Sequence, residues 1–314
     1  MFTIAGSGFG LYGYLPALVD AGEEVVLPAA YRAMVVARPE LAAYAPGVRW
    51  AADADAALEG ADAIVIATPP ARQLELALRC LALPSLGTLL LEKPVAPTPR
   101  EAIALLDALR RAGKRYRVGY TLLHAAWAGR LAAAMASGAP LSIRWRFKAH
   151  HYARDLRNWK RFPAQGGGAL RFFGIHVLAL LARIGYREVL DSVLRADSSD
   201  EAACWEASFE GPGLGRCTVL VDSRSAQTGF EVALERGGKR ERLLRLDDPF
   251  AEEVPKGGGD RRIGVLARLL ATLDERDAPF AALYDETDRL WLATEEASRF
   301  ERAPTAGGDA GRGA

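Results

Sequence analysis

Hydrophobic and polar positions alternate along the first part of the chain, as short apolar runs separated by longer amphipathic stretches. The apolar runs have the length of buried strands and lie at 3–5, 24–27, 48–50, 63–67, 88–91 and 117–120. Between most of them leucine and alanine recur at helical spacing, as in 72–83 and 100–112. Strands that alternate with helices predict an α/β domain with a doubly wound parallel sheet, which we place at residues 1–121.

The pattern changes after Pro140. We expect a long strand, a helix, a group of four strand-like runs and two late helices, at 141–151, 168–183, 188–245, 261–275 and 284–302. Strands that follow strands predict a mostly antiparallel sheet, and therefore a second, α+β domain at 122–302. Residues 303–314 are rich in glycine and alanine and are predicted to form a disordered tail.

Composition limits the classes of protein that fit. Of the 314 residues, 50% are hydrophobic and 25% are charged, which suits two globular domains. The formal net charge of +1 predicts no nucleic-acid partner. Cys80, Cys204 and Cys217 are widely separated, which predicts neither disulfides nor a metal site and fits the cytoplasm. We expect no signal peptide and no membrane span.

A glycine-rich turn follows the first apolar run, directly before a helical stretch. It contains Gly6, Gly8, Phe9 and Gly10. Glycines between a strand and a helix let the backbone approach a pyrophosphate, which then lies at the helix N-terminus. The usual fingerprint has a further glycine or alanine where this chain has Leu11. The turn therefore indicates a dinucleotide site of slightly altered form.

A second motif, Glu92-Lys93-Pro94, follows the apolar run at 88–91. Ligands of open α/β sheets bind at the C-terminal ends of strands. Pro94 biases Lys93 towards an extended backbone, so that the amine is directed. A lysine there can donate a hydrogen bond to a substrate hydroxyl and stabilise developing negative charge. Taken alone, the motif is equally consistent with a surface lysine before a turn proline.

Four motifs in this order resemble those of the Gfo/Idh/MocA family of NAD(P)-dependent oxidoreductases. They are the glycine turn, Thr68-Pro69-Pro70, Glu92-Lys93-Pro94, and a triple glycine at 166–168 that leads to His176. The resemblance covers nearly the whole chain. It implies a Rossmann domain followed by an open-faced, mostly antiparallel sheet that often forms homo-oligomers, here a dimer or tetramer. It also implies hydride transfer between a nicotinamide and a hydroxyl-bearing carbon, most often of a sugar, cyclitol or nucleotide-sugar.

The resemblance implies roles for individual residues. Lys93 matches the family lysine that contacts the reacting substrate, and His176 matches the family's general acid/base, a role that suits an imidazole. The alternative for His176 is a hydrogen-bonded histidine on an apolar helix face. The cofactor is expected to contact Gly6, Gly8, Phe9, Gly10, Arg32, Thr68, Pro69, Pro70, Glu92 and Lys93. The substrate is expected to contact Tyr120, His124, Trp159, Lys160, Phe172 and His176.

Three positions depart from the family pattern. Many members have an aspartate where this chain has Phe172, a histidine where it has Gln73, and an arginine-bearing segment where it has residues 120–124. The missing carboxylate favours a divergent subfamily with an unusual substrate. Because residues four apart share a helix face, we expect Phe172 beside His176, where its ring would lower the pKa of the imidazole.

The end of the second apolar run bears on the choice between NAD and NADP. NAD enzymes usually have Asp or Glu there to accept from the ribose 2′-hydroxyl, whereas this chain continues into residues 28–32 without a carboxylate. Arg32 could pair with a 2′-phosphate and stack on adenine, which favours NADP over NAD. The alternative is that Arg32 is a solvated arginine in the next helix.

The strand expected at 141–151 has basic residues at every second position. They are Arg144, Arg146, Lys148 and His150. Period two places all four on one face of a sheet. This face is either solvated or binds an anionic substrate, such as a nucleotide diphosphate or a carboxylate. Trp159 and Lys160 lie nearest the triple glycine and are expected to reach the pocket.

The sequence thus predicts an NAD(P)-dependent oxidoreductase that acts on a small hydroxylated or carbonyl compound. Two alternatives stay open. One is a nicotinamide-dependent hydrolase or lyase of a glycoside, which would show no net change in nicotinamide absorbance during turnover. The other is a non-catalytic Rossmann subunit, against which the presence of both Lys93 and His176 argues.

Overall fold

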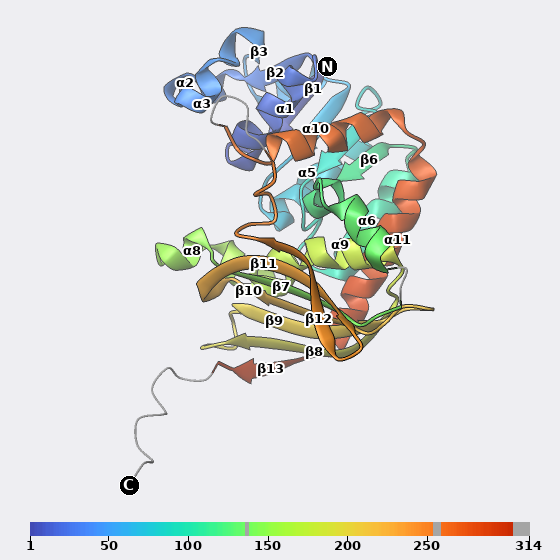
Figure 1. Ribbon diagram of the computed structural model, residues 1–314. Helices are drawn as coiled ribbons and strands as arrows, with labels where there is room; N and C mark the ends of the chain where they lie inside the picture. The colour runs from blue at the N-terminus through green and yellow to red at the C-terminus, as the bar shows by residue number, and fades with distance from the viewer. Residues whose placement is uncertain (136–137, 254–258, 304–314) are drawn as a thin grey trace.

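The first domain is built on a six-stranded sheet, as the computed structural model shows (Figure 1). The model describes residues 1–135, 138–253 and 259–303. The strand order is β3-β2-β1-β4-β5-β6, and all neighbours are parallel. The strands are Phe2–Ala5 (β1), Val25–Pro28 (β2), Val48–Ala51 (β3), Ala63–Ile66 (β4), Thr88–Leu91 (β5) and Arg115–Val118 (β6). This order confirms the predicted Rossmann sheet, whose ligand crevice opens where the order reverses.

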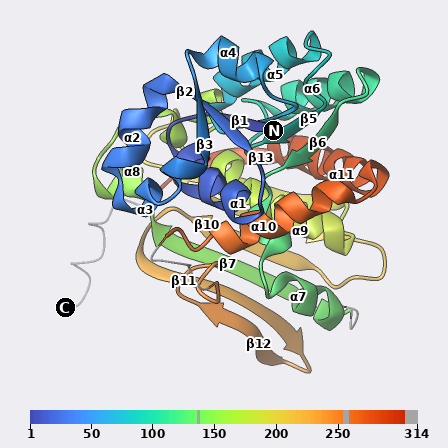
Figure 2. The same cartoon turned by 90° about the horizontal axis from the view of Figure 1, so that it is seen from above.

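Helices lie on both sides of this sheet (Figure 2). Every residue of β4 is buried, as expected for a parallel strand covered on two faces. The helices of this part are Leu15–Asp20 (α1), Arg32–Ala37 (α2), Pro39–Ala42 (α3), Ala54–Glu59 (α4), Pro70–Leu81 (α5) and Pro99–Arg111 (α6). A short π-helix, Gly10–Tyr14, precedes α1, and α7 follows at Ala128–Met135.

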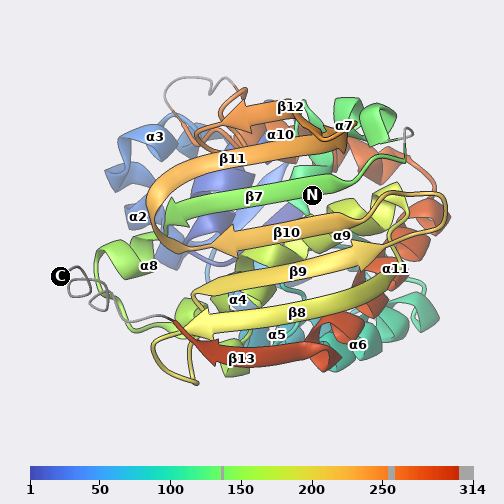
Figure 3. The same cartoon turned by 60° about the horizontal axis from the view of Figure 1, so that its bottom comes forward.

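The second domain contains a seven-stranded sheet in the order β12-β11-β7-β10-β9-β8-β13. Its strands are Leu141–Lys148 (β7), Glu188–Ala196 (β8), Cys204–Glu210 (β9), Cys217–Asp222 (β10), Arg224–Arg236 (β11), Lys239–Leu246 (β12) and Ser298–Arg302 (β13). Only β7–β10 and β8–β13 pair in parallel, so the predicted, mostly antiparallel sheet is confirmed. Figure 3 shows the strands of this sheet in front of the helices, and an oligomer formed through this face stays a prediction.

Three helices connect the two domains. In Figure 1, α9 (Ile175–Ile184) and α11 (Asp277–Glu296) lie between the two sheets. The chain returns to the first domain as α10 (Ile263–Ala271), which packs against α1 (Figure 2). The buried Arg117 of β6 fixes this return, since it donates to the Asp277 carboxylate at 2.7 Å and to the Thr272 carbonyl at 2.7 Å. No helix in the described part of the chain is long and apolar enough to cross a membrane.

Parts of the predicted elements are wrong. Residues 298–302, expected in the last helix, form β13, where Arg299 and Glu301 make ion pairs with charged residues of β8. The strand expected to reach residue 151 ends at Lys148, and His150 begins α8 (His150–Ala153), so His150 leaves the strand's alternation. Residues 304–314, almost all of the predicted disordered tail, lie outside the described residues.

Candidate functional site

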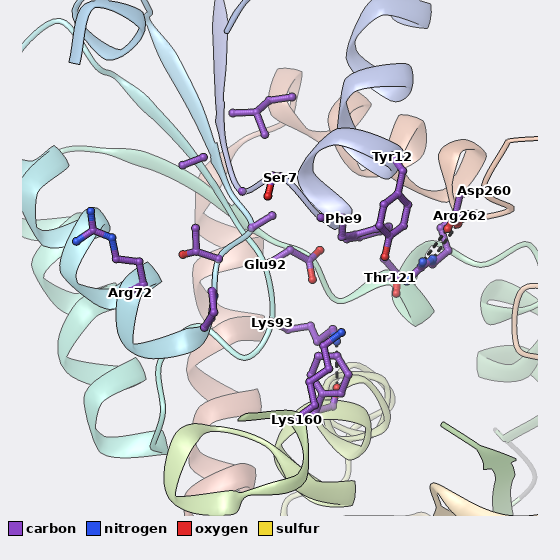
Figure 4. Close-up of a pocket in the computed structure, with 18 of the residues that line it drawn as sticks. Ser7, Phe9, Tyr12, Arg72, Glu92, Lys93, Thr121, Lys160, Asp260 and Arg262 are labelled. Carbon is purple, nitrogen blue, oxygen red and sulfur yellow. Dashed lines mark hydrogen bonds and ion pairs between the residues drawn. The ribbon is translucent and has the colours of Figure 1, made fainter. Parts of the chain in front are cut away.

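A cleft of about 1370 Å³ lies at the C-terminal ends of β1, β4 and β5 and extends to the second domain (Figure 4). Its first wall is formed by the glycine turn and by the turns that follow β4 and β5. Its second wall includes four predicted substrate residues, Trp159, Lys160, Phe172 and His176. The fold thus brings most of the predicted cofactor and substrate residues to a single cavity.

The glycine turn has the shape of a phosphate cradle. Gly6 has φ +127°, and a Cβ there would lie 2.3 Å from the Ala67 carbonyl oxygen, so only glycine fits. A Cβ on Gly8 would meet nothing within 4 Å, because this residue faces the open cleft. A Cβ on Gly10 would lie 2.8 Å from the Ile4 side chain, which makes Gly10 a packing residue behind the cleft wall. The π-helix begins at Gly10, within this turn, so its N-terminal end favours an anion here.

Gln73 holds the turn that carries Lys93. Its buried side-chain amide donates to the carbonyl oxygens of Glu92, Pro94 (3.0 Å) and Val95 (3.1 Å). The two N–H groups of this amide, shared among three carbonyl oxygens, fix the backbone on both sides of Lys93. The peptide bond between Lys93 and Pro94 is cis. The departure at Gln73 therefore preserves a rigid Glu92-Lys93-Pro94 turn.

Lys93 lies at the centre of the cleft wall. Its Nζ donates to the Phe172 carbonyl oxygen at 3.1 Å and lies 3.7 Å from the centre of the Phe172 ring. Burial lowers the pKa of Lys93; the positive charges of Arg262 and Lys160 add to this effect, and Glu92 opposes it. A lysine with a lowered pKa can exchange a proton near neutrality or donate a strong hydrogen bond.

Glu92 points into the cleft beside Lys93, as Figure 4 shows. It is only 8% exposed and accepts a 2.8 Å hydrogen bond from the Tyr14 hydroxyl. Burial raises the pKa of Glu92, while the Lys93 charge and the Tyr14 hydrogen bond act in the opposite direction. The hydrogen bond fixes the orientation of this carboxyl group at the cofactor side of the cleft.

His176 comes from the first turn of α9 and is buried at the cleft. Its Nδ1 lies 3.4 Å from the Thr121 hydroxyl oxygen, which the first domain supplies after β6. Burial lowers the pKa of His176 well below its ordinary value, and the charges of Lys93 and Arg262 lower it further. The imidazole is therefore neutral at physiological pH and able to accept a proton.

An aromatic wall faces these groups from the second domain. Trp159 and Phe172 meet edge to face, with their ring centres 5.1 Å apart, and Phe172 meets Phe173 at 4.6 Å. The Phe172 ring also receives Lys160, whose Nζ lies 5.4 Å from its centre. Phe172 was predicted to lie beside His176; both line the cleft, and its ring faces Lys93 and Lys160. Residues Ala169–Gly174 form a π-helix, for which α-helical spacing is only approximate.

Several predicted site residues do not line the cleft, although Thr68 and Pro69 do. Tyr120 is buried and packs edge-on against Tyr284, and the His124 carbonyl accepts from Arg268 at 2.6 Å. Burial lowers the pKa of His124 to about 4. The predicted site residues that do not line the cleft are Gly10, Arg32, Pro70, Tyr120 and His124. Neither Tyr120 nor His124 therefore belongs to the substrate site that we propose below.

The cleft also contains groups that sequence reasoning missed, above all Asp260 and Arg262 from the loop before α10. In the sequence they look like ordinary solvated charges at the start of an expected helix. Only the return of α10 to the first domain brings them to the glycine turn. In the described residues, no group of three or more His, Cys, Asp or Glu side chains is placed to hold a metal ion.

Comparisons with known proteins agree with this geometry. Residues 1–120 match the oxidoreductase family with an NAD-binding Rossmann fold, Gfo/Idh/MocA. KijD10, a 3-ketoreductase from Actinomadura kijaniata solved with NADP and TDP-benzene, is 16% identical, with a TM-score of 0.69 over 96% of this chain and 99% of that one. The WlbA dehydrogenase from Thermus thermophilus, solved with NAD and UDP-GlcNAcA, is 16% identical, with a TM-score of 0.67 over 96% of each chain. A comparison with curated proteins gave no match.

A third solved structure, an NAD-binding oxidoreductase from Klebsiella pneumoniae, is also 16% identical, with a TM-score of 0.67 over 94% of this chain and 96% of that one. At such identities the likeness shows a shared fold across both domains. The family match covers the domain that contains the glycine turn and Glu92-Lys93-Pro94. This match confirms, for residues 1–120, the resemblance to the Gfo/Idh/MocA family of NAD(P)-dependent oxidoreductases that is seen in the sequence.

Proposed function

We propose that the protein transfers a hydride between NAD(P) and a hydroxyl- or carbonyl-bearing carbon of a small substrate, such as a sugar or nucleotide-sugar. The observation that carries this proposal is that Lys93 and His176, from different domains, line one cleft with the glycine turn. KijD10 and WlbA, which share the fold, bind TDP-benzene and UDP-GlcNAcA, and their ligands support the nucleotide-sugar class.

The residues of the cleft fit a dinucleotide. The Cβ side of Gly8 is open, and the buried Thr68 hydroxyl oxygen has no hydrogen-bond partner among the described residues. Backbone N–H groups of the glycine turn would hold the pyrophosphate, and Thr68, Pro69 and Glu92 would line the nicotinamide side. When bound, the nicotinamide accepts or supplies the hydride.

Lys93 and His176 would both interact with the oxygen on the reacting carbon. Lys93 would donate a hydrogen bond to this oxygen and stabilise the charge that develops when the hydride moves. His176, neutral because of its burial, would take the hydroxyl proton during oxidation and return it during reduction. The Thr121 hydroxyl would orient the ring through Nδ1.

The test is a change in nicotinamide absorbance with candidate keto- and hydroxy-sugars and their nucleotide-linked forms. Substrate-dependent oxidation of the reduced cofactor, with equal amounts of product, supports hydride transfer. Product formed without net change in the cofactor would favour the glycoside hydrolase or lyase. Tight cofactor binding with no turnover across the panel would favour a non-catalytic binding subunit.

NADPH is expected to bind more tightly than NADH. No carboxylate follows β2, and the Tyr31 hydroxyl there accepts the Gly6 N–H at 3.2 Å. Arg32 lies over the Trp50 ring, 5.9 Å from its centre, whereas Arg72 lines the cleft and is the better partner for a 2′-phosphate. Fluorescence titration should show that Arg72→Ala weakens NADPH binding by about tenfold. NADH binding should be unchanged.

Equal affinities of the wild type for the two cofactors would contradict the NADP assignment. Arg32→Ala serves as the matched variant. If Arg32→Ala weakens NADPH binding and Arg72→Ala does not, the 2′-phosphate lies outside the cleft wall, on the Trp50 side. Asp55 also lines this end of the cleft, but its carboxylate lies 3.4 Å from Arg79.

Replacing Phe172 with aspartate is expected to move the pH profile of activity to higher pH. The ring lies against Lys93, whose pKa burial lowers. A carboxylate within about 4–6 Å stabilises the ammonium form and raises its pKa by roughly one unit or more. It should also raise the pKa of His176 and weaken binding of the native substrate. Phe172→Leu, which keeps the wall apolar, should retain the wild-type pH profile of activity. If the pH profile of Phe172→Asp is also unchanged, Phe172 is a packing residue only.

A further inference from the structure

An arginine–aspartate pair lies at one end of the cleft, in the loop before α10. Arg262 donates from Nε to Oδ1 of Asp260 at 2.8 Å and from Nη2 to Oδ2 at 2.7 Å. Its guanidinium carbon lies 4.1 Å from the centre of the Phe9 ring. A carboxylate along one edge and an aromatic ring against one face give the guanidinium a fixed orientation. The remaining nitrogen, Nη1, has no hydrogen-bond partner among the described residues.

Positive charge gathers around Arg262. Lys93 and Lys160 line the same cleft as Arg262, and neither forms an ion pair within the described part of the chain. The Arg262 charge helps to lower the pKa of both lysines, so the three groups are close enough to repel one another. Largely buried positive charges of this kind are unfavourable unless an anion joins them.

The nearby carboxyl groups do not supply this anion. Asp260 is already paired with Arg262 through both of its oxygens. Glu92 accepts from the Tyr14 hydroxyl, and burial raises its pKa, which reduces the negative charge it contributes. Asp248 lines the cleft and accepts the Phe250 backbone N–H, and among the described residues it makes no ion pair with Arg262 or Lys160. Asp260 is therefore the carboxylate that is paired directly with this cluster.

Arg262 lies against Phe9 of the glycine turn, on the side away from Arg72. Figure 4 shows Arg262 next to Tyr12 and Thr121, at the opposite end of the cleft from Arg72. Arg72 lies at the end that we assign to the adenosine, whereas Thr121 contacts His176 at the reacting end. The glycine turn lies between the two ends, where its backbone N–H groups would hold the pyrophosphate.

We propose that Arg262 binds an oxyanion of the substrate, a carboxylate or phosphate, with Lys160 as its second cationic contact. Asp260 and Phe9 present the free edge of the guanidinium to this group. The substrate would then be an anion whose charged group lies close to the reacting carbon. This proposal rests on the proposed oxidoreductase function for the identity of the ligand, but the anion site can be measured without turnover.

The experiment titrates inorganic phosphate into the protein saturated with NADP⁺, by calorimetry, so that the pyrophosphate site is occupied. Arg262→Gln is expected to weaken phosphate binding by at least about tenfold, as for loss of a charged hydrogen-bond partner. Arg261→Gln, which removes a neighbouring arginine at the cleft, is the matched control and should change it by less than about threefold. NADPH affinity should be unchanged in both variants.

Arg262→Lys keeps the charge but loses the fork of donors, and it guards against misfolding of Arg262→Gln. It should weaken phosphate binding by about threefold or more. Phosphate binding equal to the wild type in Arg262→Lys and Arg262→Gln would overturn the proposal. So would a loss of NADPH affinity with phosphate binding intact, because Arg262 would then be a cofactor residue. If phosphate binding falls as expected but no sugar panel gives turnover, the anion site stands and the proposed function fails.

Discussion

Lys93→Met should lower kcat/KM by on the order of 10²-fold or more while the protein stays folded. In the wild type, the Lys93 amine is held at the cleft by the Phe172 carbonyl and ring. Methionine preserves the length of the side chain and removes only its charge and its donors. The loss should appear in kcat as well as in kcat/KM, because the hydrogen bond strengthens as charge develops on the substrate oxygen.

The control for this prediction is Lys239→Met, a lysine of β12 exposed on the second sheet. It should retain wild-type kinetics. Both variants should unfold at the wild-type temperature, since burial disfavours the charged form of Lys93 in the folded protein. Wild-type turnover in Lys93→Met would contradict a catalytic role for Lys93. Arg262 would then be the next candidate for stabilising charge on the substrate oxygen.

The predicted site residues that the fold brings to the cleft are those whose place follows from topology. Parallel strands end on the same edge of a sheet, so the glycine turn and Lys93 had to meet once β1, β4 and β5 were recognised. The burial of β4 and the helical spacing of α5 and α6 made these elements readable from apolar positions alone. The helix predicted at 168–183 followed from its apolar length, although the structure divides it into a π-helix, Ala169–Gly174, and α9.

Other parts depend on long-range contacts that a local pattern does not contain. Arg262 reaches the cleft because α10 packs against α1, far away in the sequence. Tyr120 and His124 were expected to contact the substrate but do not line the cleft. The chain turns into the core after β6, and only Thr121 of this segment reaches the cleft. Residues 298–302 form a strand because β8 offers them a free edge with complementary charges.

Gln73 departs from the family pattern without loosening the turn that carries Lys93. The family histidine is absent at this position, yet the Gln73 amide donates to the carbonyl oxygens of the turn that carries Lys93. Phe172 is different, because an aromatic ring stands against Lys93 where many family members have an aspartate. The aromatic wall and the cationic groups Arg262 and Lys160 at the cleft support the anionic substrate proposed above.

His176→Gln is expected to lower kcat/KM by on the order of 10²-fold or more, with normal cofactor binding. Glutamine keeps a polar group near the Thr121 hydroxyl but cannot carry a proton between substrate and solvent. In the oxidation direction, the wild-type rate should fall at low pH as His176 becomes protonated. Because burial lowers its pKa, this fall should lie well below the ordinary range of histidine.

The pH profile separates a proton carrier from a packing residue. In His176→Gln the acid limb of the oxidation profile should disappear, leaving a low rate that is flat across this range. Thr121→Val, which removes the hydroxyl 3.4 Å from Nδ1, should reduce the rate less and should keep the limb, since the imidazole remains. Persistence of the wild-type acid limb in His176→Gln would show that another group carries the proton. Loss of activity together with a lowered unfolding temperature would make His176 a buried structural histidine of α9.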